Sequence, residues 1–81
     1  MDHAAIVGVI IREIRQIIPE LASQSIGPAD AMADLGLTSM ERGEVIIAAQ
    51  EAMDLDIPMV QLFGPRNIGE LADLLHARQA V

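Results

Sequence analysis

The chain has 81 residues, of which 52% are hydrophobic and one is aromatic, so we expect one domain over residues 1–81 with an aliphatic core. Cysteine is absent, which excludes disulfides and thiolate chemistry and fits a cytoplasmic location, and neither a membrane span nor a signal peptide is apparent. Twelve acidic and five basic residues give a net charge of −7, which argues against nucleic-acid binding and favours basic partners.

The first predicted element is a helix over residues 2–18. Asp2 is a suitable N-cap, and Pro19 prevents simple continuation. Because isoleucine has a modest intrinsic helix propensity, burial of one face must stabilise this helix. That face is a stripe of residues at helical spacing: Ile6, Ile10, Ile14 and Ile17.

Residues 19–38 show little periodicity and form a predicted loop. A connection of about twenty residues is long for a small domain, and such loops are often functional. We expect it to be held by its own apolar side chains: Ile26, Met32, Leu35 and Leu37.

A second helix is predicted over residues 39–53. Thr38 is its expected N-cap, and Glu41, three residues later, completes a capping box. Gly36 permits backbone angles that other residues adopt only at a cost. Ser39 therefore occupies the first helical position and projects from a rigid corner.

This helix has two different faces. Val45, Ile46, Ala49 and Met53 form the face that we expect to be buried. The second face contains both apolar side chains and carboxylates, and unpaired carboxylates would be costly to bury. We therefore predict that this face is an exposed partner-binding surface. It comprises Met40, Gly43, Glu44, Ile47 and Glu51. One alternative is that Met40 and Ile47 are core residues of the bundle. For Gly43, one interpretation is that it lets a partner helix approach closely, and the alternative is that the helix merely tolerates a glycine there.

Ile57-Pro58 marks a turn, and residues 59–66 contain a possible short helix. Asn67 is predicted to cap a last helix, with Glu70 in the capping-box position. The fold class is therefore all-α, with three main helices plus a possible short one. The residues expected to be buried together are Ile10, Ile14, Val45, Ala49, Leu71 and Leu74.

The segment Asp34-Leu35-Gly36-Leu37-Thr38-Ser39-Met40 resembles the attachment motif of acyl carrier proteins, which is usually Asp-Ser-Leu after a Leu-Gly pair. The order of loop, serine, Ile-Pro turn and final helix extends the resemblance over nearly the whole chain. The resemblance implies a small, right-turning antiparallel helical bundle that is not an enzyme. It also implies that Ser39 carries 4'-phosphopantetheine, attached covalently from coenzyme A.

Three features differ from the usual pattern of that family. Thr38 stands where Asp is normal, so the cap is kept but a negative charge is lost. Gly43 interrupts the second helix at a cost of about 1 kcal/mol relative to Ala. Residues 59–63 carry no charge, where fatty-acid carriers are often acidic.

With the segment 67–73, these features resemble free-standing donor carriers of polyketide β-branching cassettes. That resemblance implies a monomer that holds an acetyl or malonyl thioester. The implied partners are a phosphopantetheinyl transferase, an acyltransferase or decarboxylase that loads the acyl group, and an HMG-CoA-synthase-like enzyme or ketosynthase. The alternatives are a carrier of fatty-acid synthesis and a helical adaptor that carries no acyl group.

The remaining polar residues predict no catalytic or metal site. His3 and His76 lie near the termini, where we expect surface positions, so a Ser-His-Asp unit with Ser39 is not predicted. The acidic turn that follows Glu51 does not have EF-hand spacing. Two roles remain open for Arg42. It could form an ion pair with Glu41 or with a loop carboxylate, or it could contact the phosphate of the prosthetic group. The alternative to attachment at Ser39 is that this residue is an ordinary serine at the start of a helix.

Overall fold

The computed structural model describes residues 1–79, which form three α-helices and two short 3-10 helices. In chain order these are α1 (His3–Ile17), η1 (Pro19–Leu21), α2 (Ser39–Met53), η2 (Met59–Gln61) and α3 (Ile68–Gln79). No strand occurs in this part of the chain, so the predicted all-α class is confirmed. The possible short helix before the last one is also present, as η2.

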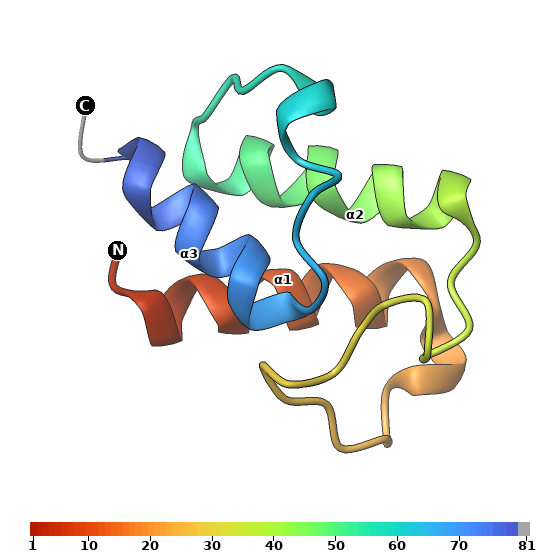
Figure 1. The fold of residues 1–81 in the computed structure, drawn as a ribbon. Coiled ribbons are helices and arrows are strands. Elements are labelled where there is room, and N and C mark those ends of the chain that lie inside the picture. The colour runs from red at the N-terminus through yellow and green to blue at the C-terminus, as the bar shows by residue number, and fades with distance from the viewer. Residues whose placement is uncertain (80–81) are drawn as a thin grey trace.

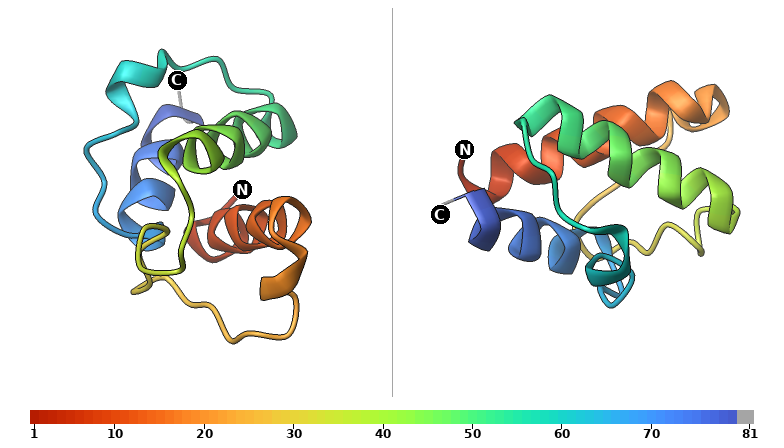
Figure 2. Two further views of the ribbon diagram at one scale, coloured as in Figure 1. Left: turned by 90° about the vertical axis from the view of Figure 1, so that its right-hand side faces the viewer. Right: turned by 90° about the horizontal axis from the view of Figure 1, so that it is seen from above.

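Helix α1 packs against both α2 and α3, and α2 runs antiparallel to it (Figure 1). The end of α3 returns to the beginning of α1, as the other two views also show (Figure 2). A hydrogen bond joins these two ends, because the Gln79 side-chain amide donates to the Met1 carbonyl. The start of α2, which carries Ser39, lies at the opposite end of the bundle (Figure 1).

An aliphatic core fills the space between the helices. Five of the six predicted core residues are buried, but Leu74 is only partly buried and Leu75 is fully buried in its place. The reason is the rotation of α3 on α1, because its buried stripe follows the spacing Ile68, Leu71, Ala72 and Leu75. The largest fully buried side chains are Ile6, Ile10, Ile14, Val45, Leu62, Ile68, Leu71 and Leu75.

The long loop is anchored as predicted. Leu37 is buried, and Ile26, Met32 and Leu35 pack partly buried against the core. The loop is also hydrogen-bonded to the start of α3, which the sequence did not reveal. The Gly69 N–H donates to the Pro28 carbonyl at 2.8 Å, and the Ile68 N–H donates to the Asp30 carbonyl at 3.0 Å.

This contact explains why residue 69 is a glycine. A Cβ atom there would lie 3.1 Å from the Pro28 carbonyl oxygen, which is closer than side chains normally approach. The hydrogen bonds satisfy two N–H groups at the α3 N-terminus that have no partner within the helix. Asn67 caps the same end as predicted, because its Oδ1 accepts from the Glu70 N–H at 2.8 Å. The Glu70 carboxylate, however, accepts from the Arg66 N–H and does not close the expected capping box.

Helix α2 ends at Met53, and the left-handed backbone of its C-cap, Asp54 (φ 55°), closes the helix. Beyond this cap, Gln50 is a buried polar residue that no sequence pattern indicated. Its Oε1 accepts from the buried Ile57 N–H at 2.5 Å, and its Nε2 lies 3.8 Å from the Met59 sulfur. Gln50 thus fixes the segment between α2 and η2.

His3 lies at the surface as expected, with 44% of its side chain exposed, but it also contacts α3. Its Nε2 lies 3.1 Å from the Gly69 carbonyl oxygen and 2.9 Å from an Asp73 carboxylate oxygen. The cause is the packing of the first turn of α1 against α3, which brings these residues together. His76 is exposed as expected. No helix in residues 1–79 is long and apolar enough to cross a membrane.

Candidate functional site

Ser39 is the first residue of α2, and its side chain is exposed. The predicted capping box holds this corner in place. Thr38 Oγ1 accepts from the Glu41 N–H at 3.1 Å, while the Glu41 carboxylate accepts from the Thr38 N–H at 2.8 Å. Ser39 is therefore presented to an external enzyme from an ordered helix terminus.

The turn before Ser39 is equally well defined. Gly36 adopts φ 94°, a backbone conformation that favours glycine, as the sequence predicted. Leu37 is buried directly after it, and its N–H donates to the Met32 carbonyl at 3.2 Å. One glycine turn and one buried anchor thus set the direction in which the chain enters α2.

The guanidinium of Arg42 contacts the serine. Arg42 Nη2 donates to Ser39 Oγ at 3.0 Å. The predicted ion pair of Arg42 with Glu41 or a loop carboxylate is not formed, because the ion pairs found in residues 1–79 are His3–Asp73 and Arg12–Glu13. A guanidinium has donors only, so Ser39 Oγ is the acceptor and its own hydroxyl proton remains available to a base.

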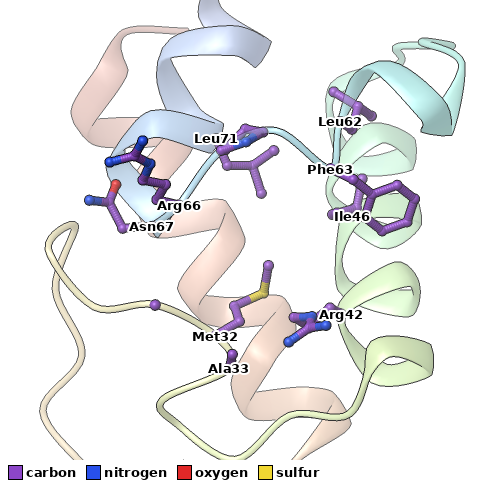
Figure 3. Close-up of a pocket in the computed structure, with 11 residues that line it drawn as sticks. Met32, Ala33, Arg42, Ile46, Leu62, Phe63, Arg66, Asn67 and Leu71 are labelled. Carbon is purple, nitrogen blue, oxygen red and sulfur yellow. The ribbon is translucent and has the colours of Figure 1, made fainter.

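An open cleft with a volume of about 170 Å³ begins beside Arg42 (Figure 3). It separates α2 from the segment that precedes α3, and Met32 enters it from the long loop. Arg66 and Asn67 line the other side. The full lining is Ala31, Met32, Ala33, Arg42, Ile46, Leu62, Phe63, Pro65, Arg66, Asn67 and Leu71.

The predicted partner-binding face of α2 is exposed. Met40 is 76% and Ile47 47% accessible, so the alternative that they are core residues is wrong. Glu44 and Glu51 on the same face are also exposed. Gly43 is half-buried, and a Cβ there would lie 4.0 Å from the Met59 methyl group, which is ordinary contact. The fold itself therefore does not require a glycine at this position.

Two further exposed apolar residues follow η2 or lie within it. Val60 is 83% and Phe63 59% accessible, and sequence reasoning missed both. The available signal was that Phe63 is the single aromatic of a chain whose core is aliphatic. Phe63 lines the cleft beside Ile46 of α2 (Figure 3).

Other polar groups do not form a second site in the described chain. Within residues 1–79, no group of histidine and carboxylate side chains has the arrangement of a metal site. His3 lies in the first turn of α1, far from the start of α2 (Figure 1). His3 therefore does not lie beside Ser39.

The chemistry of these groups suits a phosphodiester on Ser39. The hydroxyl is exposed, the positive end of the α2 dipole lies beside it, and the Arg42 guanidinium supplies charged N–H donors. The cleft beyond Arg42 is lined mainly by apolar side chains that suit a pantetheine chain. The residues present therefore fit a phosphopantetheine group.

Comparison with known proteins identifies related sequences and structures. Residues 9–75 match the family model described as "Phosphopantetheine attachment site". The chain is 40% identical over 76 residues to the polyketide biosynthesis acyl-carrier-protein AcpK of Bacillus subtilis (strain 168), with 94% of this chain and 93% of that protein covered.

A similar fold occurs in a chain of the crystal structure of the curacin biosynthetic pathway HMG synthase in complex with acetyl donor-ACP. The TM-score is 0.91 and the sequence identity 39%. The match covers 95% of this chain and 99% of that chain.

Proposed function

The chain belongs to the phosphopantetheine-attachment family, whose members are acyl carriers and not catalysts, and we propose that Ser39 is the residue that holds its 4'-phosphopantetheine. The observation that carries this assignment is the exposed Ser39 hydroxyl at the capped start of α2, 3.0 Å from a guanidinium. When bound, the group supplies a terminal thiol that carries acyl units as thioesters.

The chemistry of attachment uses the exposed hydroxyl. Ser39 Oγ forms a bond to phosphorus of coenzyme A, the diphosphate P–O bond breaks, and 3',5'-adenosine bisphosphate leaves. The hydroxyl proton passes to a base of the phosphopantetheinyl transferase, since no histidine of the described chain lies near Ser39. The capping box between Thr38 and Glu41 holds the backbone at the start of α2, from which the Ser39 side chain projects.

We infer further that the pathway is polyketide assembly and that the cargo is an acetyl or malonyl group. Support comes from the similarity to a polyketide acyl carrier and to a chain from a complex of an HMG synthase with an acetyl donor carrier. These relatives favour polyketide synthesis over fatty-acid synthesis. An acyltransferase or decarboxylase would load the carrier, and an HMG-CoA-synthase-like enzyme or ketosynthase would receive the acyl group. We propose a cytoplasmic monomer that is one carrier domain over residues 1–81.

The surface that such an enzyme would contact is the exposed face of α2, comprising Met40, Gly43, Glu44, Ile47 and Glu51, which we call the α2 surface. Phe63, which lines the cleft beside Ile46 of α2, adds an exposed apolar side chain next to this helix. Apolar contacts there would supply local fit, whereas the carboxylates would steer a basic partner and make association sensitive to salt.

The attachment site is tested by intact mass after incubation with coenzyme A and a promiscuous phosphopantetheinyl transferase. One phosphopantetheine increment is expected for the natural chain and none for Ser39→Ala. Helical circular dichroism of this variant should be unchanged, because Thr38 still caps α2. Ser25→Ala, in the exposed loop, is the matched control and should keep the increment. Persistent modification of Ser39→Ala would disprove the assignment.

The α2 surface is tested by the rate of acyl transfer to or from the partner enzyme. Ile47→Ala and Glu44→Arg should slow transfer with little change in stability, because both side chains are exposed. Glu20→Arg, at an exposed position on η1, makes the same change of net charge outside this surface and should leave transfer unaffected. Normal transfer by Ile47→Ala, or unfolding of that variant, would contradict the proposed role.

A further inference from the structure

We propose that Arg42 is a phosphate-binding residue that holds the first atoms of the prosthetic arm against the start of α2. This inference rests on the proposed attachment at Ser39. It assigns to this chain a side chain that binds the arm non-covalently, in addition to the serine that binds it covalently.

The first observation is the contact that the guanidinium already makes. Arg42 Nη2 lies 3.0 Å from Ser39 Oγ, on the same side of the first turn of α2. In a serine phosphodiester the phosphorus is bonded to this oxygen, and the non-bridging oxygens are bonded to the phosphorus, two P–O bonds from Oγ. A rotation of the Arg42 side chain is therefore enough to move its N–H groups from Oγ to those oxygens, without movement of the backbone.

The second observation is that the charge of Arg42 is not already neutralised. The ion pairs found in residues 1–79 are His3–Asp73 and Arg12–Glu13. Glu41, the nearest acidic residue in sequence, is used in the capping box. Arg42 therefore presents an uncommitted planar fork, which matches phosphate geometry and binds it with two parallel hydrogen bonds.

The third observation is that other arginines are placed differently. Arg15 donates to the Gln24 carbonyl and Arg78 to the Gln61 side chain. Arg66 lines the far side of the cleft and has an exposed side chain (Figure 3). Arg42 is the guanidinium placed to offset the repulsion between a phosphodiester and this chain of net charge −7.

A phosphate held in this way has a consequence for the arm. Arg42 also lines the cleft with Met32, Ile46 and Phe63, and lies where the cleft begins (Figure 3). Fixing the phosphate beside Arg42 limits the directions in which the rest of the arm leaves Ser39. The arm then has reduced motion near its attachment point and free motion at its thiol end.

The experiment compares the unmodified and modified forms of the natural chain by nuclear magnetic resonance. The Arg42 Nε–Hε signal should shift and exchange more slowly with water after modification, whereas the signal of Arg78, which lies outside the cleft, should not change. The phosphorus resonance of the modified form should show slower local motion than that of free phosphopantetheine. An Arg42 signal that is identical in the two forms overturns the inference without need of a variant.

Variants then assign the effect to the guanidinium. In modified Arg42→Gln the phosphorus resonance should lose its restricted motion, and Arg42→Lys should keep part of it because the charge remains. Arg78→Gln, at an exposed position near the end of α3 and outside the cleft, is the matched control and should behave as the natural chain. Unchanged phosphorus relaxation in Arg42→Gln overturns the inference, while the mass increment at Ser39 would still support the proposed function. Absence of that increment from the natural chain would instead refute the attachment itself.

Discussion

Replacement of Gly43 by alanine separates the stability of the fold from recognition by a partner. Gly43 lies in the interior of α2, where glycine costs about 1 kcal/mol relative to alanine. The added Cβ would meet the Met59 methyl group at 4.0 Å, an ordinary van der Waals contact that requires no rearrangement. We therefore expect Gly43→Ala to raise the free energy of unfolding by about 1 kcal/mol. For a domain of this size, that corresponds to a rise in Tm of about 4–8 °C.

The rate of acyl transfer, in contrast to stability, should fall in Gly43→Ala. Gly43 belongs to the proposed α2 surface, and a side chain there would keep a partner helix from approaching the backbone closely. The assays are thermal or urea unfolding followed by circular dichroism, and transfer kinetics with the partner enzyme. We expect a variant that is more stable and slower in transfer.

Gly8→Ala is the matched control, because Gly8 is also an interior helix glycine, is exposed, and would have no atom within 4 Å of an added Cβ. It should gain similar stability and transfer at the normal rate. A loss of stability in Gly43→Ala would refute the reasoning about the helix interior. A stable Gly43→Ala that transfers like Gly8→Ala would show that Gly43 does not contact the partner.

Four further substitutions test the packing. Ile14→Ala should lower the free energy of unfolding by about 2–4 kcal/mol in urea titrations, because a fully buried side chain is replaced by a cavity. Leu74→Ala should lower it clearly less, because Leu74 is only partly buried. Equal losses for the two variants would contradict the observed rotation of α3. Gln50→Leu should cost about 1–3 kcal/mol by leaving the buried Ile57 N–H without an acceptor, and an unchanged unfolding midpoint would refute that role. Gly69→Ala should destabilise the domain, because its Cβ would press against the Pro28 carbonyl, and hydrogen exchange at the Gly69 amide should then accelerate.

The features that could be predicted from the sequence are those set by residues close together in the chain. The capping box of Thr38 and Glu41 depends on a spacing of three residues, and Gly36 on the backbone freedom of one residue. The exposure of Met40 and Ile47 followed from the helical period and the carboxylates beside them. The position of Ser39 at the start of a capped helix is therefore encoded locally and can be predicted from the sequence alone.

The features that only the tertiary structure decided depend on residues far apart in the chain. Which of Leu74 and Leu75 is buried depends on how α3 is rotated against α1, because adjacent residues differ by about 100° around a helix. The need for glycine at residue 69 appears only when the loop carbonyl of Pro28 reaches the start of α3. The cleft beside Arg42 likewise forms from a loop, α2 and the segment before α3, and no local pattern encodes their meeting. The exposed position of the Ser39 hydroxyl could thus be predicted from interactions between residues close in the chain. Its surroundings, by contrast, arise from packing between distant segments.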